Sequence, residues 1–168
     1  MLSVTLIPFH GVDPDIVSGL ARDLTGLGIT ASVASPIEVP AGSFDPQRRQ
    51  HHAEAFLAAV RDIPDARILG IAKDDLYVEG LNFVFGLAER PGKAAVISLY
   101  RLQIGVDAKT YRQRVVKEAV HELGHTLGLN HCPEPGCVMH FSNSLRDTDR
   151  KGARFCAVCR RALPVGSS

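Results

Sequence analysis

One segment of the sequence spaces histidine and glutamate as they are spaced around a hydrolytic metal. It is the run H-E-x-x-H-x-x-G-x-x-H, formed by His121, Glu122, His125, Gly128 and His131. Histidines four residues apart project from adjacent turns of a helix and can bind one cation, and the carboxylate after the first lies beside them. Glycine tolerates the positive φ that ends a helix sharply and returns the chain toward the metal. Three histidine ligands leave one zinc position open, so the motif predicts a catalytic zinc site.

Four cysteines lie after this motif, and all belong to the last quarter of the chain. Cys132, Cys137, Cys156 and Cys159 form two close pairs, C-x4-C and C-x2-C, separated by a loop. Such pairs are typical of a closed four-thiolate zinc site, which has no open position and no chemistry of its own. Two disulfides or four free thiols are the alternatives. We favour the metal because the first residues lack an export signal, which predicts a reducing, cytoplasmic location.

Over residues 121–159 the chain resembles the archaemetzincin family of metzincin zinc metallopeptidases. The resemblance rests on the histidine motif and its continuation through Cys132, Cys137, Met139, Cys156 and Cys159. It implies that the catalytic zinc is bound by His121, His125 and His131. It further implies that Glu122 is the general base and proton shuttle, and that Met139 is the Met-turn methionine beneath the histidines.

The residues after this methionine depart from part of that wider group. The astacin-like branch has Met-His-Tyr at the turn, whereas this chain has Phe141 in the tyrosine position. Phe141 has no hydroxyl, and any contribution of a tyrosine to the metal or to an oxyanion is therefore absent.

The composition is that of an ordinary globular domain. Of the 168 residues, 45% are hydrophobic and 22% are charged, which argues against disorder and leaves room for about one domain. A net charge of +1 provides no global field for binding a polyanion, so we do not expect nucleic acid as a partner. No stretch of apolar residues is long enough to span a membrane.

The hydrophobic pattern predicts strands alternating with helices. We expect strands over residues 2–7, 29–34, 67–72, 82–86 and 94–99, with a loop over 36–46. We expect helices from Asp13-Pro14 to about Gly26, over residues 47–63, and over residues 109–127. This order indicates an α/β (α+β) fold with a mixed sheet, parallel at first and antiparallel at its end. The family resemblance implies that this sheet is twisted and metzincin-like.

The expected helix over residues 109–127 has two different faces. Its apolar side chains fall within about 100° of one another, and they are Val116, Ala119, Val120, Leu123 and Leu127. His121 and His125 project from the opposite side. The helix therefore presents its apolar face to the sheet and its imidazoles to a cleft.

The motif also suggests a division of the chain. We expect a catalytic domain over residues 1–131 and a Met-turn and four-cysteine zinc subdomain over 132–168, because this tail has few large apolar residues and needs a metal to fold. Its basic residues, Arg150, Lys151, Arg154, Arg160 and Arg161, are expected on a solvated surface. His10, His51 and His52 are expected at the surface too, and Asp74-Asp75 in a turn.

The sequence thus predicts a zinc-dependent peptidase that carries two zinc ions, one catalytic and one structural. Glu122 assists the attack of zinc-bound water on a peptide bond of a peptide or protein substrate. The substrate is expected to pair antiparallel to an edge strand, for which we favour residues 94–102. The alternative is a zinc-organised protein- or nucleic-acid-binding module with a vestigial peptidase site. The intact Glu122 argues against it.

Overall fold

The main feature of the fold is a five-stranded sheet. The computed structural model describes residues 2–164. The strands lie in the order β2 (Thr30–Val33), β1 (Ser3–Pro8), β5 (Ile68–Ala72), β8 (Ala94–Ser98) and β7 (Gly86–Ala88). The first four are parallel, and β7 pairs antiparallel with β8. The predicted mixed sheet, parallel at first and antiparallel at its end, is confirmed.

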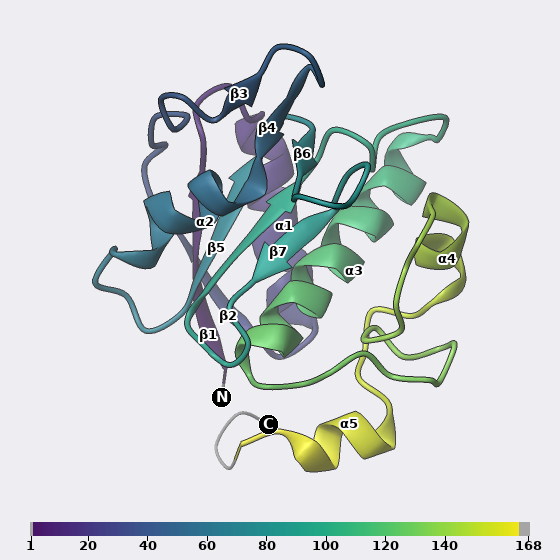
Figure 1. Cartoon of the computed structure of the whole chain (residues 1–168). Helices are drawn as coiled ribbons and strands as arrows, with labels where there is room; N and C mark the ends of the chain where they lie inside the picture. Colours follow the sequence, from purple (N-terminus) through teal and green to yellow (C-terminus); the bar gives the residue numbers. More distant parts are fainter. Residues whose placement is uncertain (1, 165–168) are drawn as a thin grey trace.

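Helices cover both faces of this sheet and give three layers (Figure 1). Side chains alternate along each strand, so neighbouring residues enter different cores. Leu6, Ile71 and Ile97 pack with α1 (Pro14–Gly26) and α3 (Ala108–Thr126). Their neighbours in sequence, among them Ile7 and Val96, pack with α2 (Ala53–Arg61) on the other face.

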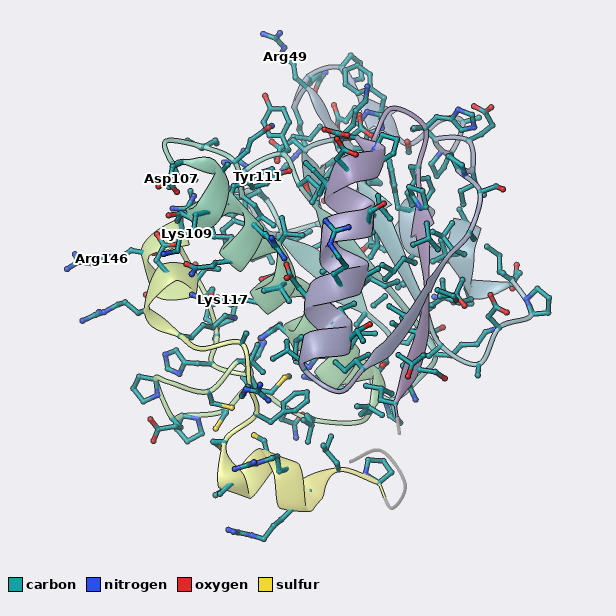
Figure 2. All side chains as sticks on the ribbon, turned by 180° about the vertical axis from the view of Figure 1, so that it is seen from behind. Arg49, Asp107, Lys109, Tyr111, Lys117 and Arg146 are labelled. Atoms are coloured by element: carbon teal, nitrogen blue, oxygen red, sulfur yellow. The ribbon has the colours of Figure 1, made fainter. Side chains whose placement is uncertain are left out.

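The helix α3 carries the histidine motif, and its two ends are defined by local chemistry. Asp107 caps its first turn by accepting a hydrogen bond from the backbone N–H of Thr110 at 2.8 Å (Figure 2). Gly128 adopts φ +90° just beyond its last residue, as predicted for a sharp end. The predicted apolar residues of this helix are buried in the core. The expected two-faced helix is therefore confirmed.

The structure contains a second, small sheet that the sequence pattern did not predict. A three-stranded sheet is formed by β3 (Phe44–Asp45), β4 (Gln50–His52) and β6 (Leu76–Tyr77). The helix expected from residue 47 begins only at Ala53, because residues 50–52 pair with strands on both sides. The expectation that His51 and His52 lie at the surface is also wrong, since both are half-buried. His10 is exposed, and Asp74 and Asp75 lie between β5 and β6, as expected.

The expectation of an edge strand over residues 94–102 is wrong. Strand β8 is buried along its whole length and lies between β5 and β7, so its main-chain groups are already paired on both sides. The strand at this edge is β7, which the sequence pattern placed a few residues too early, over 82–86.

The C-terminal tail wraps around the end of α3 and contains the short helices α4 (Leu145–Arg150) and α5 (Ala157–Ala162) (Figure 1). Cys137, Val138 and Met139 are buried in the same core as the apolar face of α3. The proposed boundary after residue 131 remains a prediction. The expectation that Lys151 lies on a solvated surface is wrong, since its side chain is buried and only 2% exposed.

Within the described residues there is no helix with the length and apolar character needed to cross a membrane.

Candidate metal centre

Three imidazoles from two neighbouring segments converge at the end of α3. His121 and His125 lie one turn apart on the helix, and His131 comes from the segment that turns back after Gly128. One ring nitrogen of each histidine lies within 4.8 Å of the others. The structure therefore brings together the three histidines that the motif singled out.

Backbone carbonyls orient two of these rings. His121 Nδ1 lies 2.8 Å from the carbonyl oxygen of Val138, and His125 Nδ1 lies 2.8 Å from that of Leu129. A proton on Nδ1 that is donated to a carbonyl leaves Nε2 free as a metal ligand. The turn at Gly128 thus has two consequences, because it returns His131 to the site and places the Leu129 carbonyl against His125.

The geometry fits a tetrahedral zinc ion. The Nε2 atoms of His121 and His125 are 3.2 Å apart. Two nitrogens bound tetrahedrally at the usual Zn–N distance of about 2.0–2.1 Å are separated by about 3.3 Å. Burial, together with the charge of Lys151, lowers the pKa of His121 to about 2, which keeps this imidazole neutral. Burial also lowers the pKa values of His125 and His131. Neutral imidazoles are the form that binds metals.

Glu122 belongs to a buried charged cluster that the sequence analysis missed in part. Glu118 and Lys151 accompany it, and all three side chains are nearly inaccessible to solvent. Burial raises the pKa of Glu122 well above its usual range, and the adjacent Glu118 raises it further, whereas Lys151 opposes this shift. The Lys151 ammonium donates a hydrogen bond to the His140 carbonyl at 3.1 Å and lies 3.3 Å from His121 Nδ1.

The two missed residues differ in how far the sequence could have revealed them. Glu118 precedes Glu122 by four residues, so helical spacing places both carboxylates on one face of α3. That signal was present in the sequence. Lys151 arrives from the tail beyond α4, and no local pattern connects it with the histidine motif.

Met139 packs against α3 at Gly124, inside the histidine motif. Its role as the Met-turn methionine beneath the histidines stays a prediction from the family resemblance. Its side chain is fully buried, and its sulfur occupies the space that a Cβ atom on Gly124 would need. Gly124 is one of the unspecified positions of the motif, between Glu122 and His125. A glycine there lets the methionine turn pack directly against α3.

The four cysteines converge on a second centre beside the first. Their sulfur atoms all lie within 4.8 Å of one another, and all four are free thiols. Cys132 Sγ is 3.8 Å from Cys156 Sγ, and Cys137 Sγ is 3.7 Å from Cys159 Sγ. Tetrahedral ligands at the usual Zn–S distance of about 2.3 Å are separated by about 3.8 Å. The backbone N–H of Cys159 lowers the pKa of Cys156 to about 7, whereas burial raises the pKa values of Cys132 and Cys159.

A cleft of about 650 Å³ opens above the histidines. Its lining includes β7 with the residues before it, and Phe141 from the tail. Gly86 of β7 lies directly against Glu122, since a Cβ atom there would come within 2.6 Å of Glu122 Cγ. The Phe141 ring is exposed and its centre lies 5.0 Å from that of His131. The histidines and the buried carboxylate therefore face a cleft bordered by an open sheet edge.

Comparison with known protein families identifies one that covers most of the chain. The model for peptidase family M54 matches residues 28–164. An archaemetzincin of Pyrococcus furiosus is 39% identical over 95% of this chain and 91% of the relative. An archaemetzincin of Methanopyrus kandleri is 47% identical over 75% of this chain and 73% of the relative.

Solved structures give the same result. The crystal structure of an archaemetzincin from Archaeoglobus fulgidus, complexed with malonate, superposes with a TM-score of 0.87 at 40% identity, covering 96% of this chain and all of that one. An archaemetzincin structure from Methanopyrus kandleri gives a TM-score of 0.86 at 40% identity, with 96% of this chain and 94% of that one covered. The metzincin-like fold expected from the sequence is confirmed.

Proposed function

The chain belongs to peptidase family M54, the archaemetzincin family of zinc metallopeptidases, and from this membership we propose that it cleaves peptide bonds at the histidine centre with Glu122 as general base. The observation that carries the proposal is the convergence of three neutral imidazoles and a buried carboxylate on one cleft. A metal-binding module alone has no need of the carboxylate.

The roles of the side chains follow from their positions. His121, His125 and His131 would hold the zinc ion through ring nitrogens that already converge. When bound, zinc supplies a Lewis acid that polarises the substrate carbonyl and acidifies water. Glu122 accepts the proton of the attacking water on a carboxylate oxygen. It then delivers this proton to the leaving amine as the peptide C–N bond breaks.

The surroundings of Glu122 support this role. A general base works best when its pKa is near the working pH, and burial beside Glu118 raises the pKa of Glu122 in that direction. A cation held by the adjacent imidazoles would favour the ionised carboxylate again. Lys151, buried beside both glutamates, reduces the cost of placing two acids together.

We further propose that the four cysteines bind a second, structural zinc. Their sulfur spacing supports a closed tetrahedral site. Such a site would fix the ends of the loop that contains Met139 and the Val138 carbonyl, and this carbonyl orients His121. The thiolates must remain reduced, which supports a cytoplasmic location as part of the proposal.

The substrate would pair with the open edge of β7. The Phe85 carbonyl accepts a hydrogen bond from Ser98, and the Glu89 N–H donates to Ala94, so alternate residues of this strand face β8. The main-chain groups of Gly86 and Ala88 therefore point away from β8, toward a bound peptide. Antiparallel pairing there places a peptide bond beside Glu122.

Replacing one group in Glu122 tests the proposal. Glu122→Gln keeps the size of the side chain but removes the base, and we expect cleavage to fall by about 10²–10⁴. Wild type and variant would be incubated with a mixed peptide library, and new termini would be read by mass spectrometry. A zinc-directed hydroxamate should abolish the same cleavages. Equal cleavage by both proteins at matched zinc content would refute the role of Glu122.

A further inference from the structure

The cleft above the histidines contains charge of one sign only on its accessible surface. Among the described residues that line it, Arg90 is the one charged side chain that is exposed, because Glu118, Glu122 and Lys151 are buried. The remaining lining residues are apolar or neutral, apart from the histidines. A peptide entering the cleft therefore meets one accessible charged side chain among the described residues, and it is positive.

The loop that carries Arg90 is held firmly in place. The carboxylate of Glu89 accepts hydrogen bonds from the backbone N–H groups of Lys93 at 3.0 Å and Ala94 at 3.1 Å, and it pairs with Arg61 at 2.7 Å. The N–H of Gly92 donates to the Thr126 carbonyl at 3.0 Å, which ties the loop to the end of α3. The backbone that presents Arg90 is thus positioned by both β8 and the active-site helix.

The guanidinium group of Arg90 has no polar partner in the described part of the fold. Within residues 2–164 it makes no hydrogen bond or ion pair, although its neighbour Glu89 makes several. Arg90 lines the same cleft as the three histidines and Glu122. Arg90 is therefore an unpaired cation in the cleft that contains the proposed reacting groups.

The direction of β7 determines which part of a substrate would meet this cation. Gly86 lies against Glu122, and the chain then runs through Ala88 to Arg90. A peptide that pairs antiparallel with β7 runs the opposite way, so residues N-terminal to the scissile bond lie toward Arg90. Residues C-terminal to that bond lie toward the apolar side chains of Phe83 and Phe85, which also line the cleft.

We propose that Arg90 is a specificity-determining residue that selects peptides with an aspartate or glutamate within about four residues on the N-terminal side of the scissile bond. The inference rests on the proposed peptidase function and adds a substrate class to it: acidic peptides. A carboxylate offers the guanidinium the bidentate partner that the fold does not supply.

The test uses the zinc-loaded full chain and peptides that differ in one residue. After library cleavage identifies a scissile sequence, glutamate, glutamine or lysine is placed in turn at each of the four preceding positions. For an exposed ion pair we expect kcat/KM to favour glutamate over glutamine at one of these positions by about fivefold. Arg90→Gln should remove this preference, Arg90→Lys should keep part of it, and Arg90→Glu should shift it toward lysine.

A binding measurement separates specificity from catalysis. Fluorescence anisotropy of labelled peptides with the zinc-loaded Glu122→Gln protein should show the same preference for glutamate, and Arg90→Gln in that background should abolish it. Arg146→Glu is the matched charge control, since Arg146 points into solvent and lies outside the cleft (Figure 2). It should leave the preference unchanged.

The possible failures are distinct. Cleavage with no acidic preference, or with the preference on the C-terminal side, would overturn the role of Arg90 and leave the peptidase assignment standing. A preference that survives Arg90→Gln, or that Arg146→Glu abolishes equally, would overturn it as well. If no hydroxamate-sensitive cleavage is found, the proposed function itself fails. Anisotropy with labelled peptides that differ only in a glutamate or a glutamine still decides whether Arg90 binds acidic peptides.

Discussion

Gly86 and Glu122 lie directly against each other, although Gly86 belongs to the edge strand β7 and Glu122 to the helix α3. A Cβ atom on residue 86 would lie 2.6 Å from Cγ and 2.7 Å from Oε1 of Glu122. The glycine therefore lets the strand that would bind the substrate approach the proposed base closely. In the proposed mechanism this contact would link the position of the peptide to that of Glu122.

Gly86→Ala should impair catalysis without removing the metal. The added methyl group must push Glu122 or β7 aside, and displacement of a reacting group by about 1 Å can cost about 10²-fold in rate. We expect kcat to fall by that order while zinc content and the melting temperature stay near those of wild type. Gly26→Ala is the matched control, because a Cβ atom there meets nothing within 4 Å. Similar losses in both variants would refute the argument.

The two proposed metal centres predict two zinc ions per chain. Elemental analysis of protein purified with zinc should find both. Cys156→Ser should leave one ion and lower the melting temperature, because thiolate binding contributes to folding. His125→Gln should also leave one ion but keep the tail folded. A single zinc in the wild type would disprove the second centre.

The two centres should lose their metals in a defined order. The histidine centre has three neutral ligands and an open position, whereas the cysteine centre is closed by four sulfur ligands. Graded dipicolinate should therefore abolish peptidase activity first, with half the zinc released. Loss of the tail structure, followed by circular dichroism, should require more chelator. Release in the reverse order would mean that the structural and catalytic assignments are exchanged.

The ion pair between Arg114 and Asp149 predicts a defined pH dependence of stability. Arg114 is buried and binds both carboxylate oxygens of Asp149, at 2.7 and 2.8 Å, and this hydrogen bonding lowers the pKa of Asp149 below its usual 3.8. A lowered folded-state pKa means that the stabilisation is complete above pH 3.8 and disappears as the pH falls through the lower, folded-state value.

Asp149→Asn should therefore destabilise the protein at pH 7 by about 1 kcal/mol, a value discounted for the partial exposure of the carboxylate. The difference from wild type should shrink below pH 3.8. Urea unfolding at a series of pH values measures it, with Asp62→Asn as a surface control. A difference that stays constant down to the lowest pH at which the wild type is folded would contradict the assignment.

The sequence by itself predicted the two groups of side chains that could bind metal ions. Ligands four residues apart on a helix, a glycine that ends it, and cysteines in close pairs are local relationships, and the backbone geometry of a helix or turn converts them directly into positions in space. His121, His125 and His131 converge for this reason. The apolar face of α3 was predictable on the same basis.

Only the tertiary structure decided what surrounds those centres. Lys151 is thirty residues from His121 in the sequence, and its burial beside Glu118 and Glu122 depends on how the tail folds over α3. Which strand forms the sheet edge likewise depends on long-range pairing. Strand β8 has the stronger strand pattern, but it pairs with β5 on one side and with β7 on the other. The roles proposed for the short strand β7 and the unpaired Arg90 beyond its end depend on pairing that leaves this edge open. No local sequence pattern predicts the pairing of distant strands.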